Sequence, residues 1–315
     1  MGSKIEWCDE TWNPIVGCSK VSMGCKNCYA ERMARRLKSM DLQHYQAVVD
    51  SQGWTGQIGE AEESTWGKPD RWKKSRIIFV CSMGDLFHPE VQEELIWRVI
   101  NIAYNNPQHW FLLLTKRAWR MHDVLTRSSW WCNEFPVNIW LGVSVEDQTT
   151  AQERIPWLLE TPAMVHFVSY EPALYPLDLT AVECRGNLLG DRLRDWALPA
   201  KIDWVICGGE TGPGARPIDP AWARSVRDQC RMAGVPFMFK NWGEWSEAGE
   251  FYDTKHCQLI HRDTGLTKPV VGGWGRWHDA EKYTVVRRFG KKCTGRLLDG
   301  REWNELPRVY YVRFV

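Results

Sequence analysis

The stretch Ile139–Asp147 reads I-W-L-G-V-S-V-E-D, an apolar run that ends abruptly in polar and charged residues. Residues of helical character follow through Leu159. A short buried strand followed by a helix is the repeating unit of folds with parallel sheets. We therefore interpret this stretch as one strand–helix unit.

Five further apolar runs have the same form, and an amphipathic stretch follows most of them. They are Ile77–Cys81, Trp110–Leu114, Val165–Val168, Trp204–Cys207 and Phe237–Phe239. A short first strand is expected within residues 1–16. The pattern predicts an α/β fold, a partial (β/α)6-type barrel over residues 1–245 with an insertion near 41–75. From residue 246 to 315 we expect an irregular extension that caps the barrel.

Charged side chains follow the predicted strands where each one ends. They are Asp85, Lys116, Glu146, Glu171, Glu210 and Lys240. In a parallel barrel the carboxyl ends of the strands meet on one face, and the loops there carry the active site. Buried charges are costly unless they bind or pair. Two interpretations stay open: a binding site, or ion pairs that close the barrel.

Three cysteines lie in one loop, residues 17–31, with the spacing C-x6-C-x2-C: Cys18, Cys25 and Cys28. A structural zinc normally takes four protein ligands, whereas three thiolates on a [4Fe–4S] cluster leave one iron open. The spacing alone also allows chance clustering, or zinc with a distant fourth ligand such as His44.

The composition limits the class of protein. The chain has 315 residues, a formal charge of +1 and eleven cysteines. It shows no signal-peptide pattern and no run of eighteen apolar residues, so we expect a cytoplasmic protein without membrane spans. In a reducing compartment, many cysteines favour a metal centre and free thiols over disulfides.

Two basic segments could bind phosphates within this near-neutral chain. The helix expected from Cys28 to about Met40 contains Arg35 and Arg36, and the run Arg71–Arg76 contains Lys73 and Lys74. Basic residues on a helix are also common on ordinary solvated surfaces, and that alternative stays open.

Several motifs together resemble a known family. They are W-N-P-I-V-G-C-x6-C-x2-C-Y-A-E from Trp12, L-T-K-R at 114–117, G-V-S-V-E-D at 142–147, V-S-Y-E-P at 168–172, G-G-E-T-G-P-G-A-R-P at 208–217 and K-N-W-G-E-W at 240–245. The sequence resembles a phage-associated three-cysteine family related to radical SAM enzymes. That resemblance implies a partial barrel of the radical SAM kind, with a [4Fe–4S] cluster and S-adenosylmethionine (SAM) on its open iron.

The resemblance assigns Cys18, Cys25 and Cys28 as cluster ligands. The chain departs from the usual C-x3-C-x2-C spacing, and Asn27 stands where an aromatic residue normally precedes the last cysteine. The residues expected to bind the cofactor are Tyr29, Ser82, Gly84, Asp85, Lys116, Ser144, Glu146, Glu171, Gly208, Gly209 and Glu210. Those expected to bind substrate are Arg35, Arg36, Lys73, Lys74 and Lys240.

The leading hypothesis is a radical SAM enzyme that abstracts hydrogen from a nucleic acid or nucleotide, with a reductase or flavodoxin-like protein as electron donor. The same chemistry on a peptide or small molecule is one alternative. A non-catalytic nucleic-acid-binding protein that holds zinc or an inert iron–sulfur cluster is the other.

Overall fold

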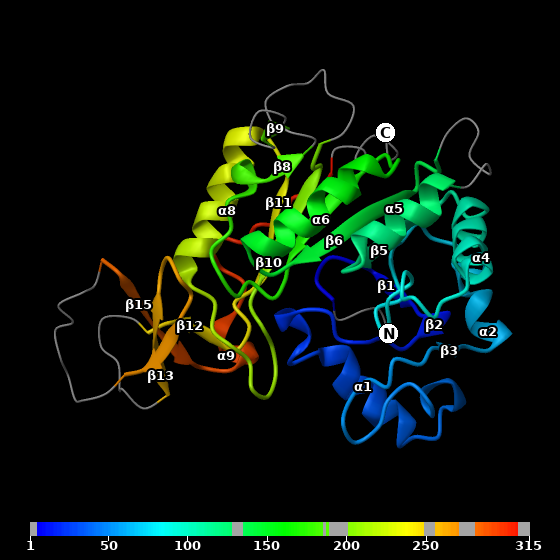
Figure 1. Ribbon diagram of the computed structural model, residues 1–315, viewed down its shortest axis with the longest axis horizontal. Helices are drawn as coiled ribbons and strands as arrows, with labels where there is room; N and C mark the ends of the chain where they lie inside the picture. The colour runs from blue at the N-terminus through cyan, green and yellow to red at the C-terminus, as the bar shows by residue number, and fades with distance from the viewer. Residues whose placement is uncertain are drawn as a thin grey trace. The chain divides into compact units, whose positions relative to one another are not determined.

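The computed structural model describes residues 5–127, 135–184, 187–188, 201–248, 256–270 and 281–307 (Figure 1). The chain divides into two compact units. The first contains Met1–Ser144 and Arg154–Phe167, and the second contains Val145–Glu153 and Val168–Val315. None of the helices in the described ranges is long and apolar enough to cross a membrane.

A seven-stranded parallel sheet is the main element of the fold, in the order β1-β4-β5-β6-β7-β10-β11 (Figure 1). Its strands are β1 Glu10–Trp12, β4 Ile77–Val80, β5 Trp110–Thr115, β6 Ile139–Val145, β7 His166–Tyr170, β10 Trp204–Gly208 and β11 Phe237–Asn241. Each predicted strand is present, and their spatial order follows the chain. The predicted α/β fold with a parallel half-barrel sheet is confirmed.

Helices follow most of these strands, as the periodicity predicts. They are α4 Glu93–Tyr104, α5 Ala118–Arg127, α6 Gln148–Glu160 and α8 Pro220–Ala233. Helix α8 begins where the Asp219 side chain accepts a hydrogen bond from the Ala221 N–H, and it ends at Gly234 in the left-handed conformation. An acidic residue before the first turn and a glycine after the last are the usual helix boundaries.

Tryptophan and phenylalanine fill the core of the first unit. Trp12 is fully buried and packs edge-on against Trp66 and Phe111, with ring centroids 6.3 and 5.9 Å apart. Trp110 and Trp140 pack at 5.2 Å. Several of the chain's twenty tryptophans are therefore core-packing residues.

The insertion near 41–75 folds against the helix that follows the cysteine loop. It contains η2 Gln43–Tyr45, β3 Gly59–Glu60, α2 Glu63–Trp66 and α3 Lys68–Arg71, and β3 pairs with β2 Ile15–Val16. Helix α1 Tyr29–Lys38 lies beside this segment (Figure 1). Tyr45, Val48 and Val49 are buried in one cluster with residues of α1. The insertion therefore packs against α1 and against Cys28 of the cysteine loop.

The second unit adds a small antiparallel sheet to its part of the parallel sheet. Its order is β12-β15-β13-β14, formed by Trp245–Glu247, Tyr283–Arg288, Cys257–His261 and Thr267–Pro269. The unit also contains η4 Leu179–Ala181, β8 Glu183–Cys184, β9 Asn187–Leu188 and α9 Lys291–Thr294. The boundary at residue 245 stays a prediction, and 249–255, 271–280 and 308–315 lie outside the described residues.

Candidate metal centre

The cysteine loop is hydrogen-bonded to the turn that follows β4. The Gly17 N–H donates to the Met83 carbonyl at 3.1 Å, and the Asp85 N–H donates to the Gly17 carbonyl at 3.3 Å. Gly17 and Gly84 thereby form a parallel bridge. This pairing places Cys18, the next residue of the loop, beside the carboxyl end of β4.

The side chain of Asn13 holds the same turn from the other side. Its Oδ1 accepts hydrogen bonds from Ser82 Oγ at 3.1 Å and from the Met83 N–H at 3.0 Å. The Tyr29 hydroxyl, at the start of α1, donates to the Ser82 carbonyl at 2.7 Å. Residues on both sides of the cysteine triplet therefore fix Ser82, a predicted cofactor-binding residue.

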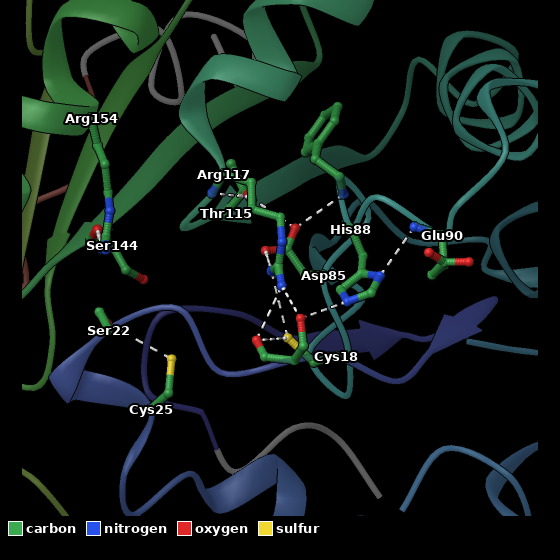
Figure 2. A network of polar contacts seen from close by, with 12 residues as sticks. Cys18, Ser22, Cys25, Asp85, His88, Glu90, Thr115, Arg117, Ser144 and Arg154 are labelled. Carbon is green, nitrogen blue, oxygen red and sulfur yellow. Dashed lines mark hydrogen bonds and ion pairs between the residues drawn. The ribbon is translucent and has the colours of Figure 1, made fainter. Parts of the chain in front are cut away.

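The three loop cysteines are free thiols and half-buried. Cys18 interacts electrostatically with Cys28, and Cys25 lies 3.8 Å from Ser22 Oγ (Figure 2). Along the described residues, no three or more His, Cys, Asp or Glu side chains are grouped so that they could hold one metal ion. His44 accordingly does not join the cysteines in such a group; its ring packs on Tyr45 instead, 4.6 Å between centroids.

Lys116 is a buried cation that interacts electrostatically with Cys25 and Cys28. Burial lowers the pKa of Lys116 to about 8, although both thiols act to raise it. Burial acts to raise the pKa of Cys25, but the Lys116 ammonium and the backbone at Val21 and Ser22 bring that pKa below its ordinary value. A thiol whose pKa is lowered is more readily available as a thiolate ligand.

Arg117 is the cation beside Cys18 (Figure 2). Its Nη1 donates to Asp85 Oδ2 at 2.7 Å and to Cys18 Sγ at 3.7 Å. Burial and the Asp85 carboxylate raise the pKa of Cys18 to about 12, and the Arg117 guanidinium partly opposes them. Cys18 and Cys25 therefore differ: the surroundings of Cys18 disfavour its thiolate, whereas those of Cys25 make its thiolate easier to form.

A buried histidine completes the network around Arg117. Arg117 Nη2 donates to Ser19 Oγ at 2.8 Å, and His88 Nε2 lies 2.8 Å from the same oxygen. The Glu90 N–H donates to His88 Nδ1 at 3.2 Å, so Nε2 of the neutral ring carries the proton and donates to Ser19. Burial, then Arg117, lowers the pKa of His88.

Ser144 at the end of β6 is buried in the first unit. Its carbonyl accepts a hydrogen bond from Arg154 Nη1 at 2.8 Å (Figure 2). Arg154 is itself buried, at 2% exposure, and its charge acts to lower the pKa of Lys116. In the first unit, Lys116 and Arg117 thus act on the thiols directly, and Arg154 acts on Lys116.

In the second unit, Glu171 and Lys240 form an ion pair, 3.0 Å from Oε1 to Nζ, and Ser169 Oγ donates to Glu171 at 3.2 Å. A Cβ atom on Gly208 would lie 2.5 Å from Glu171 Oε1. The space that the glycine leaves is therefore filled by this carboxylate.

The Gly209-Glu210 turn is packed by the chain in the same way. A Cβ atom on Gly209 would lie 2.1 Å from the Trp242 carbonyl oxygen. Both carboxylate oxygens of Glu210 accept hydrogen bonds from Arg216, at 2.5 to 2.9 Å. Glu146 is fully buried, with its N–H bonded to Thr150 Oγ1 at 2.9 Å. These residues have structural partners, and their assignment to the cofactor stays a prediction.

The predicted substrate-binding cations of the first unit are exposed. Arg35 pairs with Glu31 at 3.0 Å, one turn earlier on α1, and Lys20 pairs with the same carboxylate at 3.1 Å. Arg36, Lys73 and Lys74 are exposed on α1 and on the segment before β4. Their role in binding stays a prediction.

Sequence reasoning missed Asn13, Ser19, His88 and Arg117, which hold the loop and the turn beside it, and Arg154, which bonds to Ser144. Asn13 and Arg117 belong to motifs that carry the family resemblance, W-N-P and L-T-K-R, which was the only signal for them. Arg154 has no such signal because it lies within a helix, ten residues after its partner Ser144.

The model of one protein family, described as "Protein of unknown function (DUF5131)", matches residues 2–307. The chain belongs to this family. No curated protein matches it. Among solved structures it is similar to a mutant of spore photoproduct lyase, with 11% sequence identity and a TM-score of 0.42, over 92% of this chain and 71% of the other.

The donor set of this DUF5131 chain fits an iron–sulfur cluster. Each cysteine of a [4Fe–4S] site binds a different iron, so the three sulfurs need not converge on one ion. Cys18, Cys25 and Cys28 are free, and Lys116 and Arg117 supply positive charge against the thiolates. Three thiols would hold three irons and leave the fourth open.

Proposed function

We propose that this DUF5131 protein is a radical SAM enzyme. The observation that carries the proposal is the grouping of three free, half-buried cysteines on one loop beside Lys116 and Arg117, at the carboxyl ends of parallel strands. Such strand ends are where barrel folds place their chemistry.

Cys18, Cys25 and Cys28 would hold the cluster. With an electron from an external low-potential reductant, it would supply reductive cleavage of the C5′–S bond of SAM, giving methionine and a 5′-deoxyadenosyl group able to abstract hydrogen. The chain contributes the rest. Its thiolates leave one iron open, its cations balance their charge, and its buried strand ends exclude water.

The turn Ser82–Asp85 is the part of the chain that we assign to SAM. It lies directly against the cysteine loop through the Gly17–Gly84 bridge, and Tyr29 contacts its Ser82 carbonyl. Asp85 already accepts three hydrogen bonds, from Thr115, Phe87 and Arg117. The methionine amino group would therefore compete with these partners for the Asp85 carboxylate.

We further propose a polyanionic substrate, a nucleic acid or nucleotide. Residues 17–40 contain six basic residues and one acidic residue, a formal charge of +5 in a chain whose total is +1. Positive charge is thus concentrated on the cysteine loop and α1, where it would attract a phosphate backbone. The phage association is likewise a proposal that rests on the resemblance.

The test is anaerobic iron–sulfur reconstitution followed by incubation with SAM and dithionite. We expect a brown protein that forms 5′-deoxyadenosine, and loss of this product in Cys25→Ala. Cys293→Ala is the matched control, since Cys293 is an exposed free thiol of the second unit. A colourless protein that retains zinc, or product formation equal in both variants, contradicts the proposal.

A further inference from the structure

Arg117 joins one cysteine of the triplet to a buried carboxylate. Nη1 donates to both Asp85 Oδ2, at 2.7 Å, and Cys18 Sγ, at 3.7 Å. Nη2 donates to the carbonyl and hydroxyl oxygens of Ser19, at 3.1 and 2.8 Å. One guanidinium thus binds the carboxylate, the loop backbone and the ligand sulfur together (Figure 2).

The orientation of Arg117 is fixed by its surroundings. The side chains of Arg117 and Asp85 are only 9% and 7% exposed. Asp85 is itself held, because its Oδ1 accepts from Thr115 Oγ1 at 2.8 Å and from the Phe87 N–H at 3.0 Å. A charge-assisted bond between such groups holds its geometry.

We propose that Arg117 sets the reduction potential of the cluster through Cys18, and that Asp85 is the acceptor that positions Arg117. The inference rests on the proposed cluster. Hydrogen bonds to the sulfurs and nearby charge are known determinants of cluster potential, because they stabilise the reduced, more negative state. A charged N–H donor at Cys18 therefore raises the potential, an effect that the Asp85 carboxylate partly offsets.

A lysine could not replace Arg117 in this arrangement. Its ammonium is a compact point charge, whereas the planar guanidinium presents five donors in a fixed fork. Arg117 uses that fork to reach Asp85, Ser19 and Cys18 at once. Arg117→Lys keeps the charge and loses the fork, and Arg117→Gln loses both, so the two variants separate charge from hydrogen bonding.

The experiment is an anaerobic redox titration of the reconstituted full chain, followed by electron paramagnetic resonance of the reduced cluster. We expect the ratio of reduced to oxidised cluster at a fixed potential to fall about tenfold in Arg117→Gln, which is about 59 mV for one electron. Arg117→Lys should fall between this variant and the parent. Arg127→Gln, a control 58% exposed at the far end of α5, should match the parent.

Iron content and urea unfolding of the same samples identify a purely structural effect. Variants that hold the parent's iron and unfold at the same urea concentration but shift in potential support the proposal. Unchanged potentials in both Arg117 variants overturn it and leave the proposed function standing. A parent that binds no cluster overturns both.

Discussion

The backbones of Gly17 and Gly84 approach so closely that a Cβ atom on Gly84 would lie 2.8 Å from the Gly17 carbonyl oxygen. The atoms in the way are backbone atoms, which cannot rotate aside. This contact joins the loop that carries three cysteines to the turn at the end of β4. The position of Cys18 thus depends on two residues that carry no side chain.

Gly84→Ala should push the cysteine loop away from this turn. Overpacking of this kind costs about 1–3 kcal/mol, and we expect a loss of that size in urea unfolding together with reduced iron uptake. Gly67→Ala is the control, because the nearest atom to its Cβ would be a flexible arginine side chain at 3.4 Å. Equal stability of the two variants would show that the backbone at Gly17 and Gly84 can move apart without a loss of stability.

Asn13→Ala should also loosen the turn, because it removes the acceptor for Ser82 Oγ and the Met83 N–H. Leaving buried donors unsatisfied costs about 1–3 kcal/mol, measured by urea unfolding. Asn13→Asp retains the accepting oxygen and should recover most of the loss. If aspartate is as damaging as alanine, the acceptor is not what the turn requires.

The strands could be predicted because each one is a run of buried residues that ends in polar ones. The errors are at the strand ends. β6 continues two residues beyond the predicted Val143, and β7 ends at Tyr170 instead of Val168. Ser144 and Ser169 are buried within these strands, so polarity alone placed the ends too early.

The environment of the cysteines was harder to predict, since it depends on contacts between distant residues. Arg117 lies ninety-nine positions from Cys18. The insertion reads as polar, yet its scattered Tyr45, Val48 and Val49 are all buried together with residues of α1. Neither periodicity nor residue spacing carries such information.

The stability of the chain should decrease in mild acid, in part through His88. Burial and Arg117 lower its native pKa, so between the unfolded value of about 6.5 and the native value the unfolded chain binds more protons. Stability is unaffected above this window and falls as the pH drops through it. Urea unfolding from pH 8 to 5 should show a shallower dependence in His88→Gln than in the parent. A parallel pH dependence in the two proteins would contradict this role.

Binding of nucleic acid should depend on salt through the exposed cations near the cysteine loop. We expect Arg36→Ser and Lys74→Ser each to reduce the slope of log affinity against log salt by about 0.7 for single strands and 0.9 for duplexes. Fluorescence anisotropy with labelled oligonucleotides measures this slope. Arg127→Ser, which removes an exposed charge from α5, should leave the slope unchanged. Weak binding that is identical in all four proteins would rule out the polyanionic substrate.

Cys18, Cys25 and Cys28 should together hold a four-iron cluster, and iron and acid-labile sulfide per chain after anaerobic reconstitution measure this. We expect about four of each for the parent, near-complete loss in each Cys→Ala variant of the loop, and full retention in Cys293→Ala. A parent with one zinc per chain, or iron that survives all three loop substitutions, would contradict it.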